Sequence, residues 1–134
     1  MNILIVEDDV FYLDILARHV RGWDHDVTRA ETGRTALQKA AAMNFDLFLL
    51  DVFLPDMTAM DLIPRLRRHQ PEARIVTLTG QNSRELELEL RRLGIAYYMA
   101  KPVSASELHT VIEHMSRLPI ATHPAVRASA AASV

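Results

Sequence analysis

The chain has 134 residues, of which 49% are apolar and none is cysteine, and its formal net charge is −2. A domain of this size can bury a substantial core, the lack of cysteine excludes disulfides and thiolate metal sites, and near-neutral charge argues against binding polyanions or membrane surfaces. No apolar run approaches the roughly 20 residues of a membrane span, and Met1 leads directly into a strand-like segment, so we expect a cytoplasmic protein without membrane contact.

Five short apolar segments of the chain predict β-strands. Residues 3–6, 46–52 and 74–79 are rich in branched side chains and lack polar alternation, a pattern typical of parallel strands that are covered on both faces. Residues 25–30 form a weaker candidate, and residues 97–100 supply the last strand. Each segment is followed by a stretch with helical spacing of its apolar residues, so the predicted order of elements is (βα)5.

Helix boundaries are marked by residues that favour a start or a stop. Asp9 precedes the first helical stripe and Gly22 follows it. Pro64 lies inside the third predicted helix, where its missing N–H predicts a kink or a delayed start. Three pairs resemble capping boxes at the starts of the third, fourth and fifth helices: Thr58 with Asp61, Asn82 with Glu85, and Ser104 with Glu107.

The alternation of strands and helices predicts an α/β fold built on a doubly wound, five-stranded parallel sheet, because crossovers between parallel strands are right-handed. We expect residues 1–118 to form one domain. Residues 119–134 lose the helical period and are rich in alanine and serine, which predicts a disordered tail or the start of a linker.

Polar residues follow four of the predicted strands at the edge where open α/β sheets bind their ligands. They are Glu7, Asp8 and Asp9 after the first strand, Asp51 after the third, Thr79 and Gly80 after the fourth, and Lys101 and Pro102 after the fifth. Neighbouring carboxylates cannot all stay ionised without a counter-charge, and a few oxygen ligands in a preformed cleft suit Mg²⁺. The sequence therefore predicts a magnesium site at this edge, although Asp9 is more simply explained as a helix cap.

Four motifs carry a resemblance to the response-regulator receiver domain of two-component signalling. They are VEDD at 6–9, DVFLPDM at 51–57, LTG at 78–80 and LGIAYYMAKP at 93–102, and the resemblance covers residues 2 to about 118. It implies a receiver domain over residues 1–118 with the flavodoxin-like strand order 2-1-3-4-5. It also implies a cis peptide bond between Lys101 and Pro102.

The resemblance assigns roles to individual residues by their position in these motifs. Asp51 matches the residue that accepts a phosphoryl group, and Thr79 and Lys101 match the two residues that assist it. Thr79 and Tyr98 match the residues that switch conformation. The implied Mg²⁺ ligands are Glu7, Asp8, Asp51 and the backbone carbonyl of Phe53. None of the six histidines has a motif for donating the phosphoryl group, and all are more simply interpreted as surface residues.

The sequence departs from the family pattern at four positions. Leu54 replaces the usual methionine before Pro55, Ala59 replaces the usual glycine, and Phe53 and Pro64 are the other two. None of these changes removes a reacting group, so they bear on rates and local geometry rather than on the activity.

The function implied by the resemblance is a phosphorylatable signalling switch. A sensor histidine kinase or a phosphotransfer protein would donate the phosphoryl group to Asp51 in a Mg²⁺-dependent step. The face formed by the fourth helix, fifth strand and fifth helix would then change and control a downstream effector, an output domain or a second copy of the chain in a homodimer. We expect no enzymatic turnover beyond phosphorylation and dephosphorylation of the chain itself.

Three other functions are weighed against the switch. A Mg²⁺-dependent phosphohydrolase with Asp51 as nucleophile would need a general acid two residues later, and Phe53 cannot transfer a proton. A flavodoxin-type binder would need a loop of glycine and hydroxyl residues where this chain has acids. The basic residues at 65–69 and 91–92 suggest DNA binding, but cations at helix C-termini complement the helix dipole, so we expect no direct contact with nucleic acid.

Overall fold

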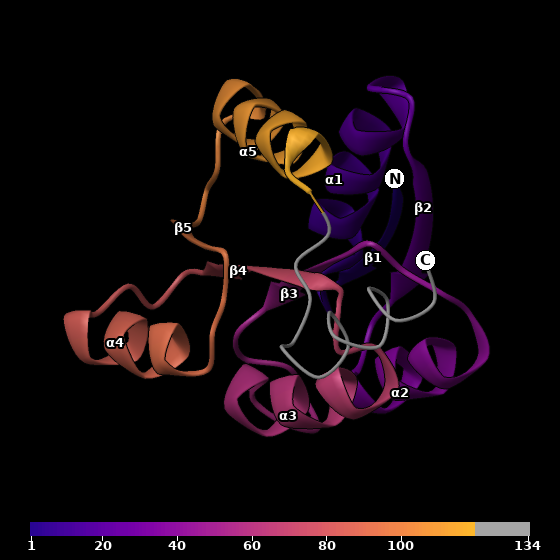
Figure 1. Ribbon diagram of the computed structural model, residues 1–134. Helices are drawn as coiled ribbons and strands as arrows, with labels where there is room; N and C mark the ends of the chain where they lie inside the picture. Colours follow the sequence, from indigo (N-terminus) through magenta and orange to yellow (C-terminus); the bar gives the residue numbers. More distant parts are fainter. Residues whose placement is uncertain (120–134) are drawn as a thin grey trace.

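A five-stranded parallel sheet forms the centre of the molecule in the computed structural model, which describes residues 1–119 (Figure 1). The strand order is β2-β1-β3-β4-β5, which confirms the predicted doubly wound fold. The strands are β1 (Asn2–Val6), β2 (Asp26–Ala30), β3 (Leu47–Asp51), β4 (Arg74–Thr79) and β5 (Tyr97–Ala100). The helices are α1 (Val10–Gly22), α2 (Gly33–Ala42), α3 (Ala59–His69), α4 (Arg84–Arg92) and α5 (Ala105–Arg117).

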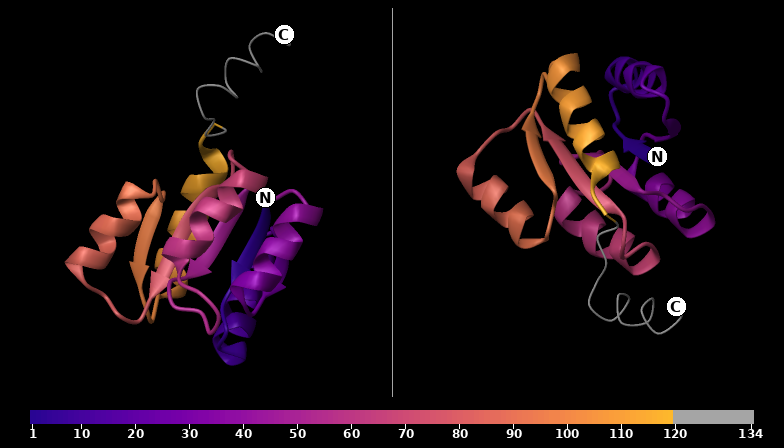
Figure 2. Two further views of the ribbon diagram at one scale, coloured as in Figure 1. Left: turned by 90° about the horizontal axis from the view of Figure 1, so that it is seen from below. Right: turned by 45° about the horizontal axis from the view of Figure 1, so that its top comes forward.

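Helices cover both faces of the sheet, with α1 and α5 on one face and α2, α3 and α4 on the other (Figures 1 and 2). Alternate residues of β1 face the two layers: Ile3 and Ile5 pack in the cluster that contains Leu13 of α1, whereas Leu4 packs in the cluster that contains Leu62 of α3. All four residues from Ile3 to Val6 are fully buried. Burial on both faces explains why the strand is an unbroken apolar run.

The starts of the helices show which capping signals the fold uses. The side chain of Asp9 accepts hydrogen bonds from two amides of α1, and Ser104 accepts one from Glu107 at α5. Asp61 accepts bonds from both the amide and the hydroxyl group of Thr58. The predicted pairing of Asn82 with Glu85 is wrong: Ser83 caps α4 by accepting from the Leu86 amide, and Asn82 instead accepts a bond from the hydroxyl group of Tyr98.

Pro64 does not delay α3, which begins at Ala59 directly after its cap and continues to His69 with Pro64 in its interior. Ala59 is fully buried, and its amide bonds to the carbonyl of Val52. Only Asp24 and Gly94 have positive φ among the described residues, so Ala59 does not need the freedom of glycine.

His25 contradicts the expectation that the histidines lie on the surface. Its side chain is 7% exposed, with Nδ1 2.9 Å from the amino group of Met1 and Nε2 3.5 Å from a carboxylate oxygen of Glu113. The other four histidines in the described part of the chain are exposed. His123 and the predicted tail from 120 onward lie outside the described residues, and within these no helix is both long and apolar enough to span a membrane.

Candidate functional site

Three carboxylates meet at the carboxyl-terminal edge of the sheet. Glu7 and Asp8 follow β1 and Asp51 ends β3, and because these two strands are parallel neighbours their ends lie side by side. One oxygen atom from each side chain lies within 4.8 Å of the other two. Glu7 is 2% exposed and Asp51 is 7% exposed, whereas Asp8 faces solvent. The cluster therefore has two buried members and one side open to water.

Lys101 enters this cluster from the end of β5. Its ammonium group lies 2.8 and 3.0 Å from the two carboxylate oxygens of Glu7 and 3.3 Å from an oxygen of Asp51. The peptide bond that follows it, to Pro102, is cis, as predicted. The lysine therefore binds two carboxylates that come from different strands.

Tyr12 of α1 supports the lysine, and sequence reasoning missed it. The ammonium group of Lys101 lies 5.1 Å from the centre of the Tyr12 ring, a distance at which a cation is attracted to the ring face. The hydroxyl oxygen of Tyr12 also accepts a bond of 3.3 Å from the amide of Val103. The available signal was the position of Tyr12 in the first turn of the helix that follows the acidic residues.

Burial sets the protonation of the cluster. It raises the pKa of Glu7 from 4.5 to about 7, although the hydrogen bond from Lys101 opposes the rise. Burial also raises the pKa of Asp51, against the charge of Lys101. Burial disfavours the charged form of Lys101, but the hydrogen bond to Glu7 and the charge of Asp51 outweigh it and raise its pKa. Burial therefore disfavours the ionised form of both buried carboxylates, even with Lys101 beside them.

A hard divalent cation fits this donor set. The described residues offer three converging carboxylates and no softer ligand, and one of the three is open to solvent, which leaves room for water or a phosphoryl oxygen. A cation would offset the charge that burial makes unfavourable. Phe53, two residues after Asp51, lies in the loop before α3 and pairs with Thr58 in an antiparallel bridge.

In metal-free protein, we expect the stabilisation contributed by Glu7 to be lost as pH rises from about 4.5 to about 7. The folded state holds this proton with a pKa of about 7 and the unfolded state with a pKa of 4.5, so the contribution is complete below 4.5 and declines through 7. The Glu7→Gln variant mimics the protonated acid and should flatten the profile. Thermal unfolding in EDTA at several pH values measures this, and equal pH dependence in both proteins would contradict it.

Thr79 ends β4, the strand beside β3, and Tyr98 lies on β5, where it pairs with Thr77. Thr79 is fully buried, and its hydroxyl oxygen accepts a bond of 3.0 Å from the amide of Gln81. Tyr98 is half-buried and packs against the core on the α4 side, while its hydroxyl group donates to Asn82 at 2.8 Å. Both side chains therefore form hydrogen bonds with the segment that leads into α4.

The comparisons with known proteins agree with this geometry. The family model for the response regulator receiver domain matches residues 3–113, which is most of the chain. The chain belongs to this family. It is a receiver domain of two-component response regulators.

The curated relatives of this receiver domain are longer proteins, of which the match covers only a part. The transcriptional regulatory protein ZraR of Escherichia coli K12 is 31% identical over 113 residues, which are 84% of this chain and 26% of that protein. The chain thus spans about a quarter of the length of the curated relatives it matches.

Two solved structures resemble the receiver domain closely. A CheY-like receiver domain protein from Methanospirillum hungatei JF-1 has a TM-score of 0.80 at 29% identity, covering 86% of this chain and 93% of that one. A response regulator from Burkholderia pseudomallei, with a phosphorylated aspartic acid, a calcium ion and citrate, has a TM-score of 0.76 at 26% identity and covers 87% and 72%.

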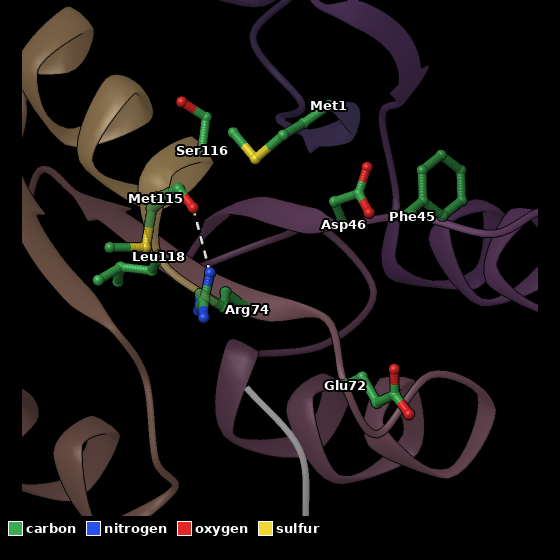
Figure 3. Close-up of a pocket in the computed structure, with 8 residues that line it drawn as sticks. All are labelled: Met1, Phe45, Asp46, Glu72, Arg74, Met115, Ser116 and Leu118. Carbon is green, nitrogen blue, oxygen red and sulfur yellow. Dashed lines mark hydrogen bonds between the residues drawn. The ribbon is translucent and has the colours of Figure 1, made fainter. Parts of the chain in front are cut away.

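A separate pocket lies at the opposite edge of the sheet from the carboxylates (Figure 3). It has a volume of about 240 Å³ and is lined by residues near the starts of β1, β3 and β4 and the end of α5. In this pocket a guanidinium nitrogen of Arg74 donates to the carbonyl of Met115 at 3.1 Å (Figure 3). Arg74 thereby satisfies a carbonyl at the end of α5, which is a structural role.

Proposed function

We propose that this receiver domain is a signalling switch that accepts a phosphoryl group on Asp51 from a sensor histidine kinase or a phosphotransfer protein. The observation that carries the proposal is the position of the buried Asp51 carboxylate, within 4.8 Å of two further carboxylates and 3.3 Å from the ammonium group of Lys101. The phosphorylated aspartic acid in the similar Burkholderia protein supports it. The cytoplasm is the proposed location, as the family resemblance implies.

In the proposed transfer, a carboxylate oxygen of Asp51 attacks the phosphorus atom of the donor. The bond from phosphorus to the donor imidazole nitrogen breaks, and the imidazole leaves with the electron pair, so that Asp51 becomes an acyl phosphate. Such a reaction needs in-line positioning and neutralisation of the phosphoryl oxygens. Lys101 can donate to these oxygens, because its ammonium group already lies near the acceptor.

Mg²⁺ is the proposed cofactor of this step. Glu7, Asp8, Asp51 and the backbone carbonyl of Phe53 would hold it, and the bound ion would neutralise the charge of the incoming phosphoryl group. The calcium ion in the Burkholderia protein is consistent with a hard cation at such a site. Lys101 alone leaves part of the negative charge of Glu7, Asp8 and Asp51 uncompensated, which is why the transfer should require the ion.

Phosphorylation would change the face formed by α4, β5 and α5 through Thr79 and Tyr98. A phosphoryl oxygen offers the Thr79 hydroxyl group an acceptor, and Tyr98 would leave its bond with Asn82 and turn inward. Reversing a 1:99 population requires about 5.5 kcal/mol, and two or three charge-assisted hydrogen bonds of roughly 1.5–3 kcal/mol each would supply it. The partner of this face would be an effector protein, an output domain or a second copy of the chain.

The decisive experiment is intact-mass spectrometry after incubation with acetyl phosphate, with MgCl₂ or with EDTA. Acetyl phosphate transfers its phosphoryl group as the imidazole donor does, with acetate as the leaving group. We expect one phosphoryl adduct with Mg²⁺ and none with EDTA, because the transfer should require the ion. Hydrogen exchange of residues 82–100 in the same sample should change on phosphorylation. An unmodified protein in Mg²⁺ would refute the proposal, and unchanged exchange in the adduct would refute the switch.

We further expect slow loss of the phosphoryl group, because Phe53 can only shield the phosphorus from water. Phe53 is 37% exposed and lies two residues after Asp51, where a polar side chain could orient a water molecule for attack. Gln81 is exposed beside Thr79 and can position that water by hydrogen bonding. Decay of the adduct in Mg²⁺ should therefore be faster in Phe53→Asn and slower in Gln81→Ala. Decay of Phe53→Asn at the wild-type rate or more slowly would contradict the shielding argument.

A further inference from the structure

Asp56, which the motifs above leave without a role, joins the loop after the phosphoryl acceptor to the start of α2. One of its carboxylate oxygens accepts a bond of 2.9 Å from the amide of Gly33, and the other accepts a bond of 2.9 Å from the amide of Arg34. These amides belong to the first turn of α2, where backbone donors have no partner within the helix. The bonds from Arg34 and Gly33 hold the pKa of Asp56 below its ordinary value, so the carboxylate is ionised at neutral pH.

The loop that Asp56 anchors is otherwise closed by its own backbone. The amide of Ala59 donates to the carbonyl of Val52 at 2.7 Å, and the amide of Leu54 donates to the carbonyl of Met57 at 3.1 Å. These bonds fix the shape of the loop, which holds Phe53 in its bridge with Thr58. They all lie within the loop and the start of α3, so they do not fix where the loop tip lies relative to α2.

A close contact reinforces the same junction. A Cβ atom added to Gly33 would lie 2.5 Å from the Cγ and Sδ atoms of Met57, which follows Asp56 and packs against the core. Only glycine lets α2 approach the loop this closely without displacing Met57. Gly33, the first residue of α2, therefore contacts two consecutive residues of the loop. Its amide binds Asp56, and its lack of a side chain leaves room for Met57.

We propose that Asp56 is a positioning residue for phosphoryl transfer: by binding the first amides of α2 it holds the loop 52–58, and with it the backbone of Phe53, in register with Asp51. This inference rests on the function proposed above, because the backbone carbonyl of Phe53 is the part of the loop assigned to the cation. Small displacements of groups that position the reactants slow a transfer reaction strongly. Asp56 touches none of the reacting atoms and acts through the loop.

The test compares Asp56→Ala with Thr32→Ala in the full chain. Thr32 caps the same helix by accepting a bond from the Thr35 amide, but it has no hydrogen bond to the loop among the described residues. Both variants remove a cap from α2 and should lower the Tm by similar amounts. Only Asp56→Ala should slow adduct formation from acetyl phosphate, by roughly tenfold, and raise the Mg²⁺ concentration needed for half the maximal rate.

Hydrogen exchange in EDTA supplies a readout that does not depend on the reaction. The amides of Leu54 and Ala59 should exchange faster in Asp56→Ala than in wild type and be unchanged in Thr32→Ala. Asp56→Asn keeps one acceptor oxygen and loses the other, so its rate and exchange should lie between those of wild type and Asp56→Ala. Gly33→Ala should also slow transfer, because its methyl group displaces Met57 while both carboxylate oxygens remain.

The outcomes separate this inference from the proposed function. If wild type forms the adduct and Asp56→Ala forms it at the same rate, the positioning role is overturned while the switch stands. Equal slowing in Asp56→Ala and Thr32→Ala would also overturn it, since the effect would then come from the stability of α2. If wild type forms no adduct, the proposed function fails and the positioning role fails with it. Selective slowing in Asp56→Ala with faster loop exchange supports the proposal.

Discussion

The Asp51→Asn variant should form no phosphoryl adduct when it is incubated with acetyl phosphate and Mg²⁺. The amide has nearly the shape of the carboxylate but lacks the anionic oxygen that attacks phosphorus. Since burial raises the pKa of Asp51, the change also removes an unfavourable charge, and the metal-free variant should unfold at a higher temperature than wild type at neutral pH. If the variant forms no adduct but is at least as stable as wild type, the loss comes from the missing nucleophile and not from unfolding.

Asp46→Asn is the matched control for this variant. Asp46 is exposed and accepts a bond of 2.7 Å from the amide of Asn2, at the opposite edge of the sheet from the cluster. An asparagine can accept the same bond, so Asp46→Asn should form the adduct at the wild-type rate. If Asp51→Asn formed the adduct in undiminished yield, another carboxylate would be the acceptor, and the assignment of Asp51 as the phosphoryl acceptor would be refuted.

Lys101→Met should slow adduct formation by about a hundredfold or more, since it removes the positioned cation that neutralises the phosphoryl oxygens. The methionine side chain can still pack over the ring of Tyr12, so the change removes the charge of Lys101 while keeping the packing of its aliphatic part. It leaves the buried Glu7 carboxylate without the two short contacts from the ammonium group. The variant should therefore also be less stable than wild type.

The stability loss in Lys101→Met should grow with pH. Without the lysine, the pKa of Glu7 rises further above 7, so the acid stays protonated at low pH and little is lost there. Wild type stops losing stability from this group at about pH 7, whereas the variant goes on losing it up to its higher pKa, because the buried carboxylate has no partner that stabilises its charge. Comparing the Tm of variant and wild type at pH 6 and pH 8.5 in EDTA measures this difference.

Lys39→Met is the control that the chain itself offers, because Lys39 is the only other lysine in the sequence. Its ammonium group donates to the carbonyl of Arg29 on β2 and has no contact with the carboxylate cluster. We expect wild-type adduct formation in this variant. Adduct formation within about twofold of wild type in Lys101→Met would contradict the role assigned to the positioned charge.

The sequence by itself determined the architecture and the members of the carboxylate cluster. The run from Ile3 to Val6 predicted a strand covered on both faces, and all five strands were placed within one residue of their observed ends. The cluster followed because the ends of parallel strands share one edge of the sheet, so residues 7, 8 and 51 had to meet there. Both inferences depend on patterns that are local in the chain or general to the fold.

Only the tertiary structure decided between local signals of equal strength. Asn82 and Ser83 are both good helix caps, and Ser83 caps α4 while Asn82 bonds to the hydroxyl group of Tyr98 from β5. His25 is buried because Met1 and Glu113 surround it, and nothing in its own segment indicates this. In both cases the outcome depends on a residue that is distant in the chain.

The bonds of Asp56 to α2 and of Lys101 to Glu7 also depend on residues that are distant in the chain. Asp56 bonds to amides 22 and 23 residues away, and Lys101 bonds to a carboxylate 94 residues away. Helical periods and capping preferences act over a few residues, so they specify which elements form but not which side chain meets which amide or carboxylate. Packing of the helices on the sheet makes that choice, because it fixes the distances between groups that the chain leaves far apart.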